Sequence, residues 1–191
     1  MTHRLPRTIR LDPSDALVFE RAAEPGEWAV PGSFAFWDEP PEALAGKRRQ
    51  AFRAGFLGLA SFGWSTLVEV AETSAAERAA AVAALAAHLR AAWGAPDEAA
   101  ANAAAEDEIG FAESLCTHPP GTILALRRSA DGGEIRERFR TLHRRADAPH
   151  SDFGALPVFG IVMVEGEERR ATEQPDGTRP DLAALARDGG T

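Results

Sequence analysis

Two successive helical patterns between Ser74 and Cys116 constrain the fold more than any other part of the sequence. Ser74 and Glu77 have capping-box spacing, and apolar residues then recur every three or four positions. Gly94 ends this first helix, and Pro96 suits the first turn of the second. Because the connection between them is short, we expect the two helices to form an antiparallel pair.

Strand patterns lie on both sides of this helical pair. We expect a first hairpin from residues 8–11 and 16–20, joined by the turn-forming residues Asp12-Pro13-Ser14-Asp15. A second hairpin is predicted from residues 122–126 and 135–143, on either side of a Gly-containing turn. Both hairpins predict antiparallel pairing.

The remaining elements complete an α+β fold. Residues 42–57 predict an amphipathic helix with one basic face, and residues 28–30 and 33–37 predict two short extended pieces. The run 158–164 is the most apolar strand, which favours the centre of the sheet. The predicted class is therefore α+β, with a mainly antiparallel sheet built from two hairpins and a central C-terminal strand, covered by about three helices.

Length and composition predict one soluble domain. The chain has 191 residues, and we expect residues 1–165 to form a single α+β domain followed by a flexible polar tail over residues 166–191. A single cysteine fits a reducing compartment, and no apolar run is long enough to span a bilayer. A net charge of -8 argues against binding to nucleic acid or anionic membranes. We therefore expect a cytoplasmic protein.

The glycine-spaced loop from Gly58 to Gly63 is the first candidate binding site. Its glycines and small hydroxyl side chains could bring backbone N–H groups close to a phosphate, which makes Gly58, Ser61, Gly63 and Ser65 candidate anion-binding residues. The loop lacks the spacing of a dinucleotide-binding or P-loop motif. The competing interpretation is a helix-to-strand connector whose apolar residues fill the core.

Histidines and one cysteine provide the metal and nucleophile candidates. His143, His150 and Asp152 could supply imidazole and carboxylate ligands to a divalent metal, although a solvated turn is the plainer interpretation. Cys116 lies two residues from His118 at a helix C-terminus, where the helix dipole raises a thiol pKa. We therefore interpret Cys116 as structural.

The candidate interaction surface combines three arginines and one tryptophan. Arg136, Arg138 and Arg140 alternate along a predicted strand, so their side chains should leave one face of the sheet about 7 Å apart. Arg127, Arg128, Arg144 and Arg145 would extend this arginine stripe. The acidic helix after Pro96 could neutralise the stripe within the chain or in a dimer, and the stripe could also be a solvated face. Trp28, in the loop from Pro25 to Pro31, is either an exposed aromatic anchor or a buried side chain.

Three sequence runs resemble an uncharacterised bacterial family of unknown function. They are Phe19 to Gly32, Gly55-Phe56-Leu57-Gly58 and Ser61-Phe62-Gly63, and the similarity covers most of the chain. Genes of that family tend to lie near accessory genes of molybdenum-dependent formate dehydrogenase and a gene for a biotin/lipoate ligase-like protein. This genomic association implies a role in molybdoenzyme maturation, and the family assigns no catalytic residues.

These observations favour a non-catalytic cytoplasmic accessory or protein-interaction module. The usual catalytic triads, metal motifs and phosphate loops are missing from the sequence, and oriented charge is its main surface feature. We expect a protein partner or a homodimer and no cofactor. The alternative is a small-molecule or anion-binding protein, including an enzyme, that uses Gly58–Gly63 and the region of His143 and His150.

Overall fold

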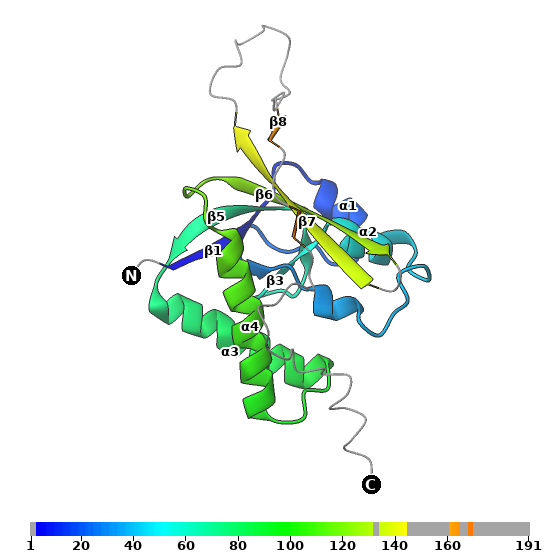
Figure 1. Cartoon of the computed structure of the whole chain (residues 1–191), viewed down its shortest axis with the longest axis vertical. Helices are drawn as coiled ribbons and strands as arrows, with labels where there is room; N and C mark the ends of the chain where they lie inside the picture. The colour runs from blue at the N-terminus through cyan, green and yellow to red at the C-terminus, as the bar shows by residue number, and fades with distance from the viewer. Residues whose placement is uncertain (1–2, 132–133, 145–160, 165–167, 170–191) are drawn as a thin grey trace, which may run out of the picture.

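Two antiparallel sheets and four α-helices make up the fold of the described residues. The computed structural model describes residues 3–131, 134–144, 161–164 and 168–169 (Figure 1). In chain order the elements are β1 (His3–Ile9), α1 (Ser14–Val18), β2 (Ala29–Val30), a 3-10 helix (Ser33–Phe36), α2 (Gly46–Ala54), β3 (Phe56–Gly58), β4 (Trp64–Ser65), β5 (Leu67–Thr73), α3 (Ala75–Ala92), α4 (Glu98–Leu115), β6 (Ile123–Asp131), β7 (Glu134–Arg144), β8 (Ile161–Val164) and β9 (Glu168–Arg169). The predicted α+β class is confirmed.

β1 stands at one end of the larger sheet, next to the loop that leads into the smaller sheet. The larger sheet runs β1-β5-β6-β7-β8, with β9 also paired to β7, and the smaller sheet runs β2-β3-β4. On the side of β1 away from β5, Thr8 N–H donates to the Glu27 carbonyl at 2.8 Å. Gly26 N–H in turn donates to the Thr8 carbonyl at 2.8 Å. The loop that precedes β2 is thereby attached to the larger sheet.

The predicted helical pair is confirmed, and its capping box is present. Ser74 Oγ accepts from Glu77 N–H at 3.2 Å, and the Glu77 carboxylate accepts from Ser74 N–H at 2.9 Å. Arg78 near the start of α3 donates to Glu106 at 2.8 Å and to Glu113 at 3.0 Å on α4, as an antiparallel arrangement requires. Six side chains of the pair are at most 1% exposed in the main core: Leu85, Leu89, Ala101, Ala105, Ile109 and Ala112. Their burial stabilises the pair more than helix propensity does.

The second predicted hairpin is confirmed, and its strands are longer than expected. Residues 123–131 of β6 pair with residues 134–142 of β7 in continuous antiparallel register. The first predicted hairpin is wrong. Residues 14–18 form α1, because the local turn in which Asp12 accepts from Ser14 N–H at 2.8 Å continues into a helical turn.

Three further predictions about the elements need correction. Residues 42–57 form a shorter helix, α2, because Phe56 and Leu57 pair with Ser65 and Trp64 instead of continuing it. Residues 33–36 are a 3-10 helix and not extended. The predicted central C-terminal strand is β8, which pairs with β7 at the end of the sheet order. Apolar composition predicts that a strand is buried and does not determine which neighbour it pairs with.

The C-terminal boundary predicted near residue 165 falls largely outside the described residues. Of the predicted tail, only Glu168–Arg169 is described, and these residues pair with Glu137 and Arg138 of β7.

Candidate functional site

A buried ion pair ties α2 and the β2 corner, the chain at Pro31 directly after β2, to the larger sheet. Arg128 on β6 is 2% exposed and donates through Nε to Glu137 on β7 at 2.6 Å. Its Nη1 donates to the carbonyls of Phe52 at 3.1 Å and Gly55 at 2.9 Å, and its Nη2 donates to the Pro31 carbonyl. Since the last carbonyls of a helix lack partners within the helix, Arg128 also caps the C-terminal end of α2.

This geometry removes Arg128 from the predicted arginine stripe. Arg128 pairs with Glu137 in the strand register, and residues paired across a sheet share a face. Glu137 is 1% exposed, so this face is the buried one. Arg128 was wrongly grouped with Arg127, because adjacent strand residues point to opposite faces.

The structure places Arg136, Arg138 and Arg140 together on the other face of β7. Arg127 is the direct cross-strand neighbour of Arg138 and joins them. Arg138 is exposed, the other two β7 arginines are half-buried, and each of the three interacts with other groups. The acidic helix α4 lies on the opposite side of β7, where Phe111 contacts Phe139 with ring centroids 5.9 Å apart. Phe111 of α4 therefore contacts the face of β7 opposite to the stripe.

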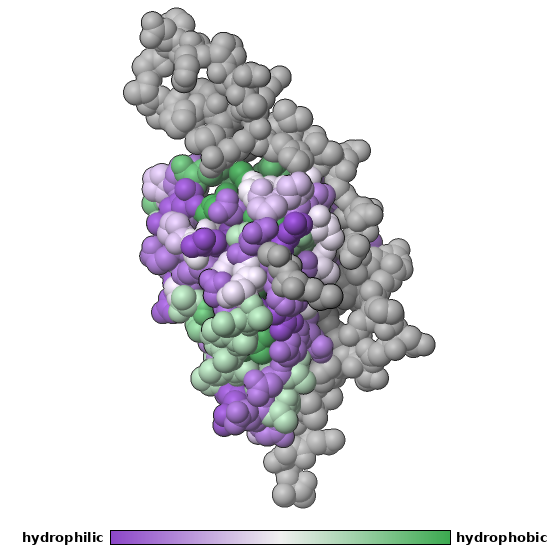
Figure 2. Space-filling model, turned by 90° about the vertical axis from the view of Figure 1, so that its left-hand side faces the viewer, coloured by the Kyte–Doolittle hydropathy of each residue, from purple (hydrophilic) through white to green (hydrophobic). Residues whose placement is uncertain are grey.

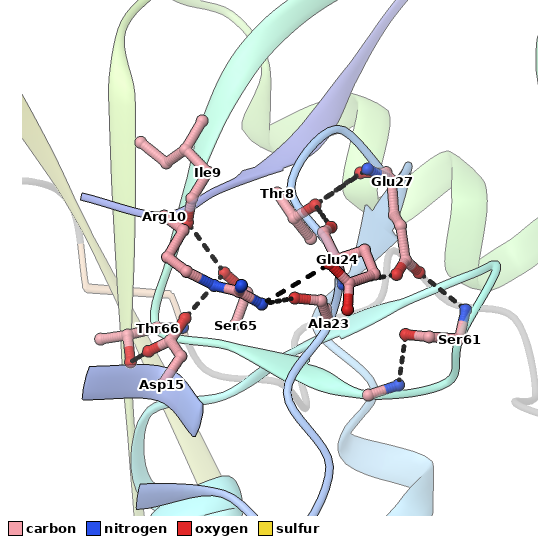
Figure 3. A network of polar contacts seen from close by, with 11 residues as sticks. Thr8, Ile9, Arg10, Asp15, Ala23, Glu24, Glu27, Ser61, Ser65 and Thr66 are labelled. Carbon is pink, nitrogen blue, oxygen red and sulfur yellow. Dashed lines mark hydrogen bonds and ion pairs between the residues drawn. The ribbon is translucent and has the colours of Figure 1, made fainter. Parts of the chain in front are cut away.

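The loop from Gly58 to Gly63 does hold an anion, and the anion is Glu27 of the same chain (Figure 3). Glu27 Oε2 accepts from the backbone N–H groups of Ala60 and Ser61, each at 2.9 Å. Its Oε1 accepts from Glu24 N–H at 2.6 Å. The side chain is 9% exposed, so the carboxylate replaces water with these three donors.

Hydrogen bonding keeps the Glu27 carboxylate charged. Burial alone raises its pKa, but the hydrogen bonds from Ser61, Glu24 and Ala60 together outweigh burial, and the pKa is lowered. The two glycines of the loop serve this packing. A Cβ on Gly58 would lie 2.5 Å from Glu27 Oε2, and a Cβ on Gly63 would lie 2.6 Å from the Ala22 backbone.

Other contacts fix the remaining candidate anion-binding residues. Ser61 Oγ accepts from Gly63 N–H at 3.0 Å, and Ser65 is 1% exposed and donates to the Leu67 carbonyl at 2.8 Å. Phe62 at the tip of the loop has a positive φ of 53° and stacks on His88 of α3, with centroids 3.6 Å apart. Burial lowers the pKa of His88, which favours its neutral form in this stack.

A surface groove opens where this loop meets α3. It has a volume of about 400 Å³, and its lining combines the Pro25–Trp28 loop, the Leu59–Ala60 segment and one side of α3. The α3 residues that line it are Glu77, Ala80, Ala81 and Ala84. Trp28 is half-buried, packs against the main core and still lines the groove. The structure therefore lies between the two alternatives predicted for Trp28.

Two of the three predicted metal ligands lie outside the described residues. His143 lies on β7, where its backbone pairs with Val162, whereas His150 and Asp152 lie outside the described residues. No group of three His, Cys, Asp or Glu side chains in residues 3–131 and the other described segments could hold a metal ion.

Cys116 has the surroundings of a structural cysteine. It is 4% exposed, and burial first, followed by the charge of Glu113, raises the pKa of its thiol to about 12. The thiolate is the nucleophilic form of cysteine, so this thiol is unreactive near neutral pH.

Sequence reasoning missed the two carboxylates that organise these regions. Glu27 binds a loop that lies more than 30 residues later in the chain. Asp15 is 6% exposed and accepts from Thr66 Oγ1 at 2.6 Å. For the burial of Arg128 a local signal was available. Strand periodicity places Arg127 and Arg128 on opposite faces of the sheet, so only one of them can share a face with the stripe.

Comparison with known proteins places the chain in a family without giving it an activity. No curated protein and no solved structure matches it. None of the helices in the described part of the chain has the length and apolar character needed to cross a membrane. One family matches residues 1–154, under the description "Family of unknown function (DUF6505)". The match spans most of the 191 residues, and the chain belongs to this family.

Proposed function

We propose that this protein is a non-catalytic protein-interaction module whose docking surface is the groove between the Pro25–Trp28 loop and α3. The observation that carries the proposal is the position of Trp28, an aromatic side chain held half-buried by the core in the wall of an open groove. Tryptophan is one of the side chains enriched at the energetic centres of protein interfaces.

The polar groups of the groove support binding more than catalysis. Both oxygens of the Glu27 carboxylate accept backbone hydrogen bonds, and its lowered pKa makes it a poor general base near neutral pH. The Glu77 carboxylate is engaged by the Ser74 backbone and hydroxyl at 2.9 and 2.7 Å. The two carboxylates of the groove thus serve loop packing and helix capping.

The proposal also names a cellular compartment, the cytoplasm, and a process, the maturation of molybdoenzymes. A cytoplasmic accessory role is supported by the single buried cysteine, and a place in molybdoenzyme maturation rests on genomic association alone. The arginine stripe of Arg136, Arg138 and Arg140 is proposed as a second contact surface for an acidic partner or a second copy. The shared face of these three residues on β7 supports this.

The alternative of anion binding at Gly58–Gly63 would require Glu27 to leave its position. Any phosphate using Ala60 and Ser61 N–H would have to displace a carboxylate already bound at 2.9 Å by both groups. We therefore do not advance it as a second function.

A matched pair of substitutions tests the docking surface. Ala80→Arg fills the groove with a long side chain, whereas Ala83→Arg adds the same charge at an exposed position of α3 outside the groove. Arginine is a good helix former, so both variants should fold. Native mass spectrometry after cross-linking in the source cells should show a stoichiometric protein partner that Ala83→Arg keeps and Ala80→Arg loses. Equal retention by both variants, or no partner on the wild-type chain, would contradict the proposal.

A further inference from the structure

Several of the residues that line the groove have small side chains. Ala80, Ala84 and Gly26 project at most a methyl group into it, so a partner's side chain could reach Trp28 and Leu59 without displacing anything long. Apolar anchors that enter such preformed pockets account for most of the energy of many interfaces. The small side chains of the lining therefore favour an apolar side chain at the centre of the docking segment.

The rim and the surrounding layer are acidic. Glu77 is exposed at the edge of the groove. The side chain of neighbouring Glu24 is 75% exposed, and its Oε2 lies 4.0 Å from Arg10 Nη2. The helical pair from residue 75 to residue 115 carries seven carboxylates and two arginines. Figure 2 shows weakly hydrophobic surface bordered by strongly hydrophilic surface on one side of the molecule.

The arginines near the groove are already bound to groups of this chain. Arg78 is held by Glu106 and Glu113 of α4. Arg7 donates to the Gly26 carbonyl at 3.0 Å and lies 5.7 Å from the centre of the Trp28 ring. Arg7 and Arg10 carry two positive charges beside the groove, whereas Glu24, Glu27 and Glu77 carry three negative ones. Together with the other carboxylates of the helical pair the excess charge is negative, so a basic partner would meet opposite charge.

Resting on the proposed function, we infer that the occupant of the groove is a basic segment of a partner protein that inserts one apolar side chain beside Trp28. Opposite charge then selects the partner and accelerates its approach, whereas the apolar anchor holds it. The inference specifies the chemistry of the occupant, which the proposed function leaves open.

Synthetic peptides provide the probe. A peptide of leucine and lysine in amphipathic order is compared with two peptides of identical length and order, one with glutamate in place of lysine and one with alanine in place of leucine. Isothermal titration calorimetry on the full chain measures affinity, and the Trp28 indole NMR signal reports the location of binding.

The leucine–lysine peptide should bind, shift the Trp28 signal and weaken as salt is raised. Ala80→Arg should weaken it about tenfold or more, and clearly more than the charge-matched Ala83→Arg. Glu24→Gln and Glu77→Gln should each weaken it about 1.5- to 5-fold, as expected for exposed charges. Glutamine at position 77 keeps the capping box, so the helix stays intact.

Three outcomes would overturn the inference: equal binding of the glutamate peptide, equal binding of the alanine peptide, or equal effects of Ala80→Arg and Ala83→Arg. A concentration-dependent dimer that Ala80→Arg abolishes in sedimentation would assign the groove to a second copy and also overturn it. If Ala80→Arg loses the cellular partner while the peptide results fail, the groove is a docking surface for a partner of other chemistry. If both fail, the proposed function fails with it.

Discussion

Replacing Glu137 by leucine would leave the Arg128 guanidinium buried without its carboxylate. Removing one member of a buried ion pair costs about 3–5 kcal/mol, because the remaining charge keeps its desolvation penalty. Domains of this size are stable by only about 5–15 kcal/mol, so Glu137→Leu should lose a large part of the free energy of unfolding. Urea unfolding measures this loss through the transition midpoint at unchanged slope.

The double variant Arg128→Met with Glu137→Leu gives the sharper test. Replacing both members of a buried ion pair by apolar residues is often neutral. Here it should not be, because Arg128 also satisfies the carbonyls of Phe52, Gly55 and Pro31. Each carbonyl left unsatisfied in the interior costs about 1–3 kcal/mol, so the double variant should remain destabilised by roughly 3 kcal/mol or more.

A milder control separates charge from hydrogen bonding. Glu137→Gln keeps an acceptor for Arg128 Nε and removes only the charge, so it should be less destabilising than Glu137→Leu. A double variant within about 1 kcal/mol of the wild type, near the typical effect of a single substitution, would refute the argument that Arg128 connects α2 and the β2 corner to the sheet.

Three further predictions concern titratable groups. Glu27→Gln should destabilise the fold by about 1.5–3 kcal/mol near neutral pH. Because the pKa of Glu27 is lowered from its ordinary 4.5, the stabilisation it provides is present above that value and is lost as pH falls through the folded pKa. The difference in unfolding free energy between wild type and variant should therefore shrink in acid, and a difference independent of pH would contradict the assignment. The pKa of His88 is lowered from its ordinary 6.5, so the unfolded chain binds a proton at this residue more readily than the folded chain does. The free energy of unfolding should therefore decrease as pH falls below 6.5. His88→Phe, which can keep the stack on Phe62, should remove that part of the pH dependence, and an unchanged profile would show that His88 does not titrate differently on unfolding. With a thiol pKa of about 12, Cys116 should react with iodoacetamide at pH 8 far more slowly in the native chain than in urea, and equal rates would show the site to be open.

Local signals predicted the helical pair and the second hairpin correctly. The Ser74 capping box acts over three residues, and the turn between β6 and β7 acts over a similarly short span. Such signals need no knowledge of the rest of the chain. The same kind of reasoning failed at residues 14–18, where turn chemistry and helix-starting chemistry use the same residue types.

The candidate groove was only partly predictable. The sequence singled out Trp28 and the Gly58–Gly63 loop separately, on the basis of an aromatic side chain and glycine spacing. Their meeting with Ala80 and Ala84 on α3 depends on how the Pro25–Trp28 loop and the Leu59–Ala60 segment pack against the helix. No period or spacing in the sequence encodes that approach.

By itself the sequence determined the α+β class, the helical pair, the second hairpin and the shared face of Arg136, Arg138 and Arg140. These features follow from short-range periodicity and capping. Only the tertiary structure decided that Glu27 is the anion bound by Ala60 and Ser61, and that Arg128 is buried while its neighbour Arg127 is exposed. The reason is that a buried charge requires partners of opposite sign or a set of hydrogen-bond donors, and folding brings these from distant parts of the chain.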